Sequence, residues 1–534
     1  MRRKNDQNQL LSRRSLLAAG VLGSGSLAVT SPTADGAEAQ GKFDLEPGVG
    51  KPRTMAGKLA ESPSLADFGP VGDGVTDDWR AVQTALDWAG SKPGTRLRVP
   101  PRVYAIGRPL LIPQGIELVG EVPGDGNTAL CGFRALKGFQ SPHKMRVSSA
   151  KGSRDIGIAA LLISREWAEG RSFARRLHLR DLFFDVDGVT EAQGGPVHGL
   201  LLANQQLDLS NLWIRSATGF GVWINTQRPD GTFMAALVDN VLRRVWVRGA
   251  GIGGATFETN AGVFQYGGFL IGALPGVRDP SGRGEPPLAT DGIMDYCTVA
   301  VGPEAETGCR GNAIHITRSA GWRVTSCHVN GAGRHGIALE RAFQSEVSGC
   351  YVDGWGVVPG RDQGPMGAIW CSSIVGLDDG AEGGLIVASN RISCRPVKYS
   401  NPPGMAAIAV RAGATPAARA AVMGNTVVKR RGATQPIAAF DFARSGRGEL
   451  SAMVTGNSIS ETLNVFLAPW NETAVKPKFS GNSFQFAAVA PLDGWFPAGL
   501  RIDNSAPAPG SYCGWVVVRS GKPAMWAGHG RIEV

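Results

Sequence analysis

The sequence predicts an all-β fold, a single-stranded parallel β-helix (β-solenoid) with a short N-terminal helix cap and a small C-terminal β module. Two observations lead to this prediction. Short phrases of similar residue types recur at intervals of about 22 to 35 residues, which is the spacing of stacked coils that bury one continuous core. The 534 residues include 74 Gly and only 19% charged residues. This composition suits many short strands joined by tight turns.

The first 39 residues have the pattern of an export signal. Arg13 and Arg14 precede an apolar stretch rich in Gly and Ala, and small residues ending at Ala39 offer a cleavage site. This pattern predicts a twin-arginine signal peptide over 1–39, cleaved near Ala39, and a periplasmic or secreted mature protein. The apolar stretch is too short and too polar for a stable membrane anchor. The twin-arginine translocase is therefore an expected partner during export, and a linker is expected over 40–61.

An acidic, Gly-rich motif begins the next part of the chain. Residues 67–78 read Asp-Phe-Gly-Pro-Val-Gly-Asp-Gly-Val-Thr-Asp-Asp, and an amphipathic stretch follows over 79–89. We expect a turn and then a helix with Thr76 or Asp77 as its N-cap, the carboxylates having structural roles. The motif resembles the opening of the pectate-lyase-like superfamily. That resemblance implies a right-handed parallel β-helix, here expected over 62–486. The superfamily includes polygalacturonase-like and rhamnogalacturonase-like enzymes, uronan epimerases and phage tailspike depolymerases.

The end of the chain has a different character from the repeats. Residues 509–526 contain a Pro-Gly turn, an apolar run ending in three Val, and a second short apolar run. This stretch resembles a β-hairpin module at the ends of β-helical depolymerases and tail proteins. We expect residues 487–534 to form a cap that covers the open edge of the last coil.

The repeat fixes which side chains point inward. Residues 314–318 recur as 337–341, and 327–330 recur as 350–353, both 23 residues later. Because side chains alternate along a strand, the Val or Ile of each phrase and the residue two before it share the inner face. The predicted inner column is Leu212, Val245, Cys297, Cys327, Cys350, Asn390, Asn425, Asn457 and Asn482. Stacked Asn side chains can hydrogen-bond along the column, and its cysteines are interpreted first as buried core residues and second as disulfide partners.

The outward positions are where substrate contacts are expected. Aromatic side chains stack on sugar rings, and Arg pairs with the carboxylate of a uronate. The candidate substrate-binding residues are Trp213, Arg215, Trp246, Arg248, Tyr351, Arg391, His315 and Trp370. Two interpretations of this outer stripe stay open, namely a polysaccharide groove and ordinary surface packing.

Three carboxylates and three basic side chains are the catalytic candidates. Hydrolysis of a glycosidic bond uses two carboxylates, whereas a lyase uses a base together with a cation or Arg that neutralises the uronate. The candidates are Glu340, favoured among them, with Asp353, Glu258, Arg341, Arg318 and His328. No metal ligands are assigned and no cofactor is certain, although a lyase could require Ca²⁺.

The charge balance bears on the substrate. The net charge is +10, with 42 Arg and 13 Lys, but no basic run interleaved with aromatic residues argues for nucleic acid. Together these observations predict an exported enzyme that cleaves or modifies a polysaccharide, expected to be acidic, by lyase or glycoside hydrolase chemistry. The alternative is a non-catalytic carbohydrate-binding or envelope-structural β-helix. The oligomeric state is expected to be a monomer or a trimer.

Overall fold

The computed structural model describes the strands at 42–43 and 53–54 and most of the chain from residue 61 onward. The described ranges are 61–122, 131–149, 151–171, 174–186, 195–277, 289–301, 308–357, 365–374, 383–394, 404–413, 418–429, 438–444, 449–459, 464–466, 475–480, 482–486, 490, 496, 498–504, 506–521 and 524–533. The signal peptide expected over 1–39 lies outside them. Contacts divide the chain into residues 1–60 and 61–534. In the first unit, β1 (Lys42–Phe43) and β2 (Arg53–Thr54) pair antiparallel.

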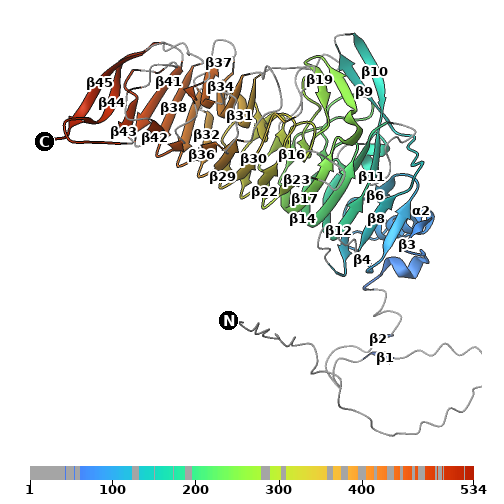
Figure 1. The fold of residues 1–534 in the computed structure, drawn as a ribbon. Coiled ribbons are helices and arrows are strands. Elements are labelled where there is room, and N and C mark those ends of the chain that lie inside the picture. The colour runs from blue at the N-terminus through green and yellow to red at the C-terminus, as the bar shows by residue number, and fades with distance from the viewer. Residues whose placement is uncertain are drawn as a thin grey trace, which may run out of the picture. The chain divides into compact units, whose positions relative to one another are not determined.

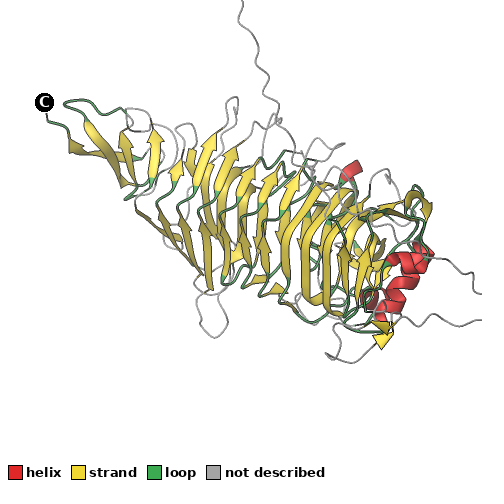
Figure 2. Cartoon of the chain, turned by 90° about the horizontal axis from the view of Figure 1, so that it is seen from below, coloured by secondary structure: helices red, strands yellow, loops and turns green. Residues whose placement is uncertain are grey.

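The second unit is a stack of coils, each of which contributes to three parallel sheets (Figures 1 and 2). The chain passes through a strand of sheet 1, bends into sheet 2, bends again into sheet 3 and returns to sheet 1 one coil further on. The long strand β14 shows this, because its first half pairs in sheet 2 and its second half in sheet 3. The predicted all-β parallel β-helix is confirmed.

The strands of each sheet follow one another along the stack. Sheet 1 contains β6 (Leu110–Ile112), β11 (Ala159–Ser164), β13 (Val197–Leu202), β15 (Val222–Ile224), β20 (Phe269–Ile271), β24 (Ile314–Ile316), β28 (Ile337–Glu340), β31 (Met366–Ile374), β34 (Met405–Ala412), β37 (Ala438–Arg444) and β40 (Asn464–Phe466).

Sheet 2 contains β4 (Arg96–Val99), β7 (Glu117–Gly120), the first halves of β12 (Ala174–Asp185), β14 (Asn204–Ala217) and β17 (Val241–Ala250), then β22 (Ile293–Asp295), β26 (Arg323–Thr325), β29 (Ser345–Ser348), β32 (Gly383–Ala388), β35 (Ala418–Met423), β38 (Leu450–Thr455) and β41 (Val475–Ser480).

Sheet 3 contains β3 (Asp73–Asp77), β5 (Val103–Ile106), β8 (Gly132–Ala135), the second halves of β12, β14 and β17, then β23 (Thr298–Ala300), β27 (His328–Asn330), β30 (Tyr351–Asp353), β33 (Arg391–Cys394), β36 (Thr426–Lys429), β39 (Ser458–Ile459) and β42 (Ser483–Phe486). A short parallel sheet of β16 (Leu237–Val238), β21 (Ala289–Thr290) and β25 (Ser319–Ala320) lies beside them in the coil.

The inner column lies where the repeat predicted it. Leu212 through Asn457 are fully or almost fully buried. The Asn residues form a ladder in which the Nδ2 of Asn390 donates to the Oδ1 of Asn425, and the Nδ2 of Asn425 donates to the Oδ1 of Asn457, both at 2.9 Å. Cys297, Cys327 and Cys350 are free thiols in the same column. The interpretation of these cysteines as core residues agrees with this arrangement.

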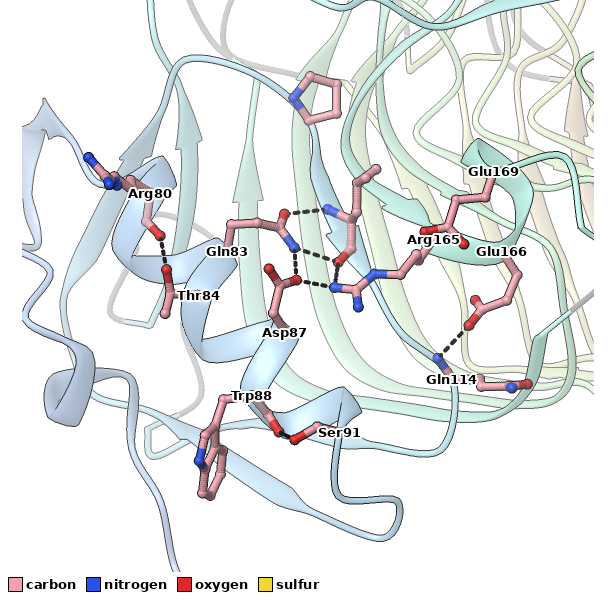
Figure 3. Close-up of polar contacts among 12 residues, drawn as sticks. Arg80, Gln83, Thr84, Asp87, Trp88, Ser91, Gln114, Arg165, Glu166 and Glu169 are labelled. Carbon is pink, nitrogen blue, oxygen red and sulfur yellow. Dashed lines mark hydrogen bonds and ion pairs between the residues drawn. The ribbon is translucent and has the colours of Figure 1, made fainter.

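The N-terminal cap is built on α2 (Trp79–Gly90), preceded by the short helix η1 (Leu65–Phe68). Gln83 on α2 exchanges two hydrogen bonds with the backbone of Leu111 on β6, and Arg165, at the start of α3 (Arg165–Ala168), pairs with Asp87 (Figure 3). These contacts fasten the helix to the first coils and cover the end of the core.

The expected N-cap of this helix was wrong by one or two residues. The N-cap is Asp78, whose carboxylate instead accepts hydrogen bonds from the backbone N–H groups of Val71 (2.6 Å) and Gly72 (2.9 Å). Asp77 accepts from the N–H of Trp79, and Asp73 accepts from the turn that follows it. The carboxylates of the opening motif therefore hold the turn together, which is the structural role expected for them.

The C-terminal module is antiparallel and continues from sheet 3. It consists of β43 (Arg501–Asn504), β44 (Tyr512–Arg519) and β45 (Met525–Arg531). β43 pairs parallel with β42, and β44 pairs antiparallel with both β43 and β45. The last described coil thus ends against a small sheet, and the expected C-terminal β module is confirmed.

Two hairpins cover part of the outer face of sheet 1. They are β9 (Lys144–Ser149) with β10 (Gly152–Gly157), and β18 (Thr256–Thr259) with β19 (Gly262–Gln265), which follows the short helix η2 (Ile252–Gly254). Phe257 and Met145 from the hairpins join Trp223 and Leu270 from sheet 1 in a second hydrophobic cluster. Trp223 is consequently buried on a face that register alone marks as outward. No helix among the described residues is long and apolar enough to cross a membrane.

Candidate functional site

A polar cluster lies on the outer face of sheet 1. Its centre is the contact between His315 on β24 and Glu340 on β28, where His315 Nε2 lies 2.9 Å from Glu340 Oε1. The two strands are neighbours, with His315 paired to Ala338, so the Glu340 side chain reaches back diagonally across one coil. The His315 side chain is 5% exposed and that of Glu340 is 36% exposed. The carboxylate is therefore held by a buried ring and still accessible from solvent.

Asn312 fixes which nitrogen of His315 carries the proton. The Oδ1 of Asn312 accepts a hydrogen bond from the backbone N–H of His335, so its Nδ2 is the group that lies 3.1 Å from His315 Nδ1. An amide nitrogen only donates, so Nδ1 of the neutral ring is the acceptor. The proton of the neutral ring is consequently on Nε2, which is the nitrogen beside Glu340.

The surroundings of Glu340 keep it ionised. Burial by itself would raise the pKa of the carboxyl group. The attraction of His315 and, to a smaller extent, of Arg334 opposes burial and is stronger, so the pKa of Glu340 lies below its ordinary value. At neutral pH the group is a carboxylate, able to accept a proton or to act as a nucleophile.

A small cavity adjoins this pair. His315, Asn312 and Arg334 line one side of it, and Phe257 and Phe264 of the β18–β19 hairpin line the other. Its volume of about 10 Å³ is close to the room that one water molecule requires. The guanidinium carbon of Arg334 lies 6.0 Å from the centre of the Phe264 ring. The hairpin thus shields one flank of the polar cluster from solvent.

The next coils extend the cluster with an aromatic platform. Trp370 on β31 lies between the ring of His335, with ring centres 4.6 Å apart, and the guanidinium of Arg411, 4.4 Å from the indole. Arg411 on β34 also pairs with Asp441 on β37 at 2.5 Å. His335 accepts a hydrogen bond from the backbone N–H of Gly367, and burial lowers its pKa well below the ordinary value. The ring is therefore neutral.

Most candidate binding residues lie on sheet 3, a different face of the coil. The indoles of Trp213 and Trp246 are paired in register with centres 4.3 Å apart. His328 and Tyr351 stack at 5.0 Å, and the guanidinium of Arg391 lies 5.6 Å from the Tyr351 ring. We call the row formed by these five residues the sheet 3 stripe. It is partly exposed, as a binding surface requires.

A charged row runs beside the stripe. Asp185 is fully buried and pairs with Arg215 at 2.6 Å and with Arg134 at 3.1 Å. Arg248 follows Arg215 in register on the next coil. Since one buried carboxylate is shared by two guanidinium groups, Arg215 has a structural partner and its availability to a substrate is limited.

The catalytic candidates do not converge on one place. Glu340 is on sheet 1, whereas His328 and Asp353 are on sheet 3, and Asp353 is 4% exposed. Glu258 is on the β18–β19 hairpin, where it pairs with Lys151 at 3.2 Å and alternates with Phe257, which faces the cavity. Of the eight binding candidates, His315 and Trp370 share the face of Glu340.

Arg318 and Arg341 occupy equivalent turns one coil apart, directly after sheet 1. Both have a positive φ, of 54° and 51°, and burial lowers the pKa of both. They follow the strands that carry His315 and Glu340, but they lie where the chain turns away from that face.

Five residues of the cluster were not among the sequence candidates. They are Asn312, Arg334, His335, Arg411 and Asp441. One signal could have found Asn312 and His335, because the 23-residue repeat that aligns 314–318 with 337–341 also aligns these two residues. Among the residues that the structure describes, no group of three or more His, Cys, Asp or Glu side chains is placed to hold a metal ion.

Parts of the chain are similar in sequence to known proteins. Residues 64–265 match a family model described as rhamnogalacturonase A/epimerase, pectate lyase-like. The tail spike protein of Shigella phage Sf6 is 41% identical over 73 residues, which are 13% of this chain and 12% of that protein. The chain therefore matches only a small part of the length of this curated relative.

Solved structures resemble the fold at low identity. PfbA, a surface adhesin of Streptococcus pneumoniae, is 12% identical, and the match covers 88% of this chain and 100% of that chain with a TM-score of 0.51. The A-module of the mannuronan C-5 epimerase AlgE4 of Azotobacter vinelandii is 13% identical over 80% of this chain and 98% of that chain, with a TM-score of 0.47. Together with the three-sheet coil, the family match supports the pectate-lyase-like superfamily that the opening motif indicated.

Proposed function

We propose that this protein is an exported, polysaccharide-active enzyme that modifies or cleaves an acidic glycan on the outer face of sheet 1. The observation that carries the proposal is the Glu340 carboxylate, which is ionised, oriented by His315 and still one-third exposed. Arg334 supplies a cation beside it, and Trp370 with Arg411 offers an aromatic surface next to a guanidinium. A uronate presents the complementary groups, namely a carboxylate and an apolar ring face.

The chemistry that suits this arrangement is removal of the proton beside the uronate carboxylate. Glu340 accepts that proton, and the electron pair left on carbon is stabilised by the uronate carboxylate, whose charge an arginine neutralises. In elimination, this pair forms a carbon–carbon double bond while the glycosidic C–O bond breaks, and the leaving oxygen takes a proton from water. In epimerisation, water returns a proton to the opposite face. Asp441, a second carboxylate on sheet 1, is engaged with Arg411, which favours these reactions over hydrolysis.

Substrate binding would strengthen Glu340 as a base. The pKa of Glu340 in the free protein is low because its interactions with His315 and Arg334 outweigh burial. A sugar that covers the exposed part of the carboxylate removes it further from water, which raises its pKa toward the range in which a general base works well. Proton abstraction is thus coupled to occupancy of the site.

The test is incubation with a panel of uronans with three products followed in parallel. Ultraviolet absorbance detects the double bond of elimination, a reducing-end assay detects any chain cleavage, and NMR detects inversion at the carbon beside the carboxylate. A double bond or inversion supports the proposal, and reducing ends without a double bond would indicate hydrolysis. Retained binding with none of the three products would rule out the enzyme and leave a carbohydrate-binding protein.

That alternative function has an observation of its own. The sheet 3 stripe, with two indoles 4.3 Å apart and the stacked His328 and Tyr351, offers flat aromatic faces, and the residues described in its strands include no exposed carboxylate base beside them. Alanine substitution of Trp213 and Trp246 together tests it, because glycan binding that depends on these indoles and survives substitution of Glu340 would place recognition on sheet 3.

Export is part of the proposal and is tested separately. The paired arginines at 13 and 14 and the small residues up to Ala39 support it. Replacement of both arginines by lysine should retain the precursor inside the cell, and N-terminal sequencing of the exported protein should give a start near residue 40. An exported protein that keeps residues 1–39 would contradict the signal peptide.

A further inference from the structure

A groove at the corner between sheets 2 and 3 carries a second group of basic and aromatic side chains. Its volume is about 460 Å³, and Arg180, Arg243, Arg244 and Tyr296 are among the residues that line it. Arg180, Ser210, Arg243 and Asp295 follow one another in register, so the groove crosses four successive coils. We call it the corner groove. Such a volume is ordinary for a small-molecule site.

The backbone at this corner is left-handed on successive described coils from Asp181 to Gly456. In the groove the residues concerned are Asn211 (φ 51°), Arg244 (φ 53°) and Tyr296 (φ 51°). Further along the same column, in register, the position is occupied by Ser326 (φ 53°) and Ser389 (φ 56°) and by Gly349, Gly424 and Gly456, with φ between 62° and 64°. Glycine adopts this conformation without strain, whereas other residues lose roughly 1–2 kcal/mol. Within the groove this strained position carries the long side chains of Arg244 and Tyr296, whereas beyond it the position carries only Ser or Gly.

The arginines of the groove differ in whether they form ion pairs with carboxylates. Arg180 lies 3.2 Å from Glu117 and 3.6 Å from Asp181, so it is shared between two carboxylates. Arg243 and Arg244 are exposed neighbours, and within the described residues neither forms an ion pair. The groove thus holds the three guanidinium groups of Arg180, Arg243 and Arg244 against the two carboxylates of Asp181 and Asp295, and the remaining positive charge would attract an anionic ligand.

The remaining side chains complete a sugar site. Tyr296 is 59% exposed and offers its ring to an apolar sugar face. Asp295 accepts a hydrogen bond from the hydroxyl of Thr325 at 2.9 Å, which orients its carboxylate and leaves acceptor capacity for a sugar hydroxyl. A guanidinium binds a planar carboxylate through two parallel hydrogen bonds. A uronate residue presents all three complementary groups.

We infer that the corner groove is a binding site for a uronate residue of an acidic glycan, separate from the Glu340 cluster on sheet 1. Arg243 and Arg244 bind the carboxylate and Tyr296 stacks on the ring. Trp246, two residues after Arg244 on the same strand, belongs to the sheet 3 stripe, so a chain held in the groove continues onto that stripe. The choice of a uronate rests on the proposed function, whereas the site itself is independent of Glu340.

Binding of a uronate homopolymer and of a neutral glucan, measured by affinity electrophoresis and titration calorimetry in the Glu340→Gln background, tests this site without turnover. Replacement of both Arg243 and Arg244 by alanine should weaken uronan binding at least tenfold, and Tyr296→Ala should weaken it severalfold. Arg519→Ala, which removes an exposed arginine of the C-terminal module, is the matched control. Uronan binding within twofold of the parent for both groove variants, or an equal loss for the glucan, would overturn the inference.

The strained backbone gives a second readout that a purely structural role would not produce. Arg244→Gly and Tyr296→Gly should raise the urea midpoint of unfolding, because glycine relieves the left-handed conformation, while uronan binding weakens. A lower midpoint would mean that these side chains stabilise the corner and would contradict a binding role. If the parent protein shows no turnover but binding still depends on Arg243 and Arg244, the proposed enzyme fails and the groove stands.

Discussion

His315 and Glu340 meet across neighbouring coils, with Nε2 of the imidazole 2.9 Å from Oε1 of the carboxylate. The Nδ2 of Asn312 lies 3.1 Å from the other ring nitrogen, Nδ1. The contact therefore holds an ionised carboxylate in one orientation without removing it from solvent. This relationship joins a residue that the sequence marked as catalytic to one that it marked as substrate-binding.

Substitution of Glu340 tests the proposed chemistry directly. Glu340→Gln keeps the size of the side chain and removes the base, so kcat should fall about 10²- to 10⁴-fold while substrate affinity stays within severalfold. Steady-state kinetics on the best uronan measures both. Glu346→Gln on sheet 2 is the matched control and should behave as the parent. Equal activity in the two variants would exclude Glu340 from the reaction.

Substitution of His315 should change the pH profile rather than simply abolish activity. Of the two side chains that lower the pKa of Glu340, His315 has the larger effect, so His315→Gln should raise that pKa. The acidic limb of kcat/KM should move to higher pH, and the rate at its plateau should fall less than in Glu340→Gln. His178→Gln, on an exposed part of β12, is the control. An unchanged acidic limb would mean that His315 does not position the carboxylate.

The sequence was sufficient to predict the β-helical coil but not the composition of the candidate site. Alternation along each strand and the 23-residue repeat correctly predicted that Cys327 and Asn425 are buried. The prediction is strict because a shift of the strand register by one residue would move every inward side chain to the outer face. The same alternation does not say to which of three sheets a strand belongs. His328 and Glu340 were both catalytic candidates, and they lie on different faces of the coil.

Two other features could not be read from periodicity. The β9–β10 and β18–β19 hairpins interrupt the repeat and cover Trp223, whose register position is outward. The N-cap of α2 is Asp78 and not Thr76 or Asp77 as expected. The Asp78 carboxylate accepts hydrogen bonds from the backbone of Val71 and Gly72, within a turn whose geometry the sequence pattern does not specify. In both cases the deciding contacts come from an irregular segment, whose position cannot be predicted from the repeat.

The Asn ladder predicts a large loss of stability from a single buried substitution. Asn425→Ala removes the acceptor of Asn390 and the donor to Asn457 Oδ1 and to the carbonyl of Val387. Unpaired buried polar groups cost roughly 1–3 kcal/mol each, so the free energy of unfolding should fall by about 2–4 kcal/mol. Urea unfolding measures the loss, with Thr426→Ala at the adjacent outward position as the control. A change below about 0.5 kcal/mol in Asn425→Ala would show that the ladder contributes little.

The buried His198 predicts a dependence of stability on pH. Burial lowers its pKa from 6.5 to about 3. Below pH 6.5 the unfolded chain takes up a proton that the folded protein excludes, so stability falls by about 1.4 kcal/mol per pH unit from 6.5 down toward 3. His198→Asn keeps an acceptor for the N–H of Phe220, which His198 Nδ1 accepts at 2.8 Å, and should remove this slope. Identical slopes between pH 6 and 5 in the two proteins would contradict a neutral His198.

The burial of the cysteines predicts that far fewer thiols react in the native protein than in the unfolded protein. None of the eight forms a disulfide in the structure, seven are buried, and Cys513 is exposed. Burial raises the pKa of Cys309 and Cys371 to about 12, and a thiol that stays protonated is a poor nucleophile. A chromogenic disulfide reagent should therefore modify one thiol per chain in the native protein and eight after denaturation. Cys513→Ser should abolish the native reaction. Fewer than eight thiols in the unreduced, denatured protein would instead reveal a disulfide and favour the second interpretation of the inner column.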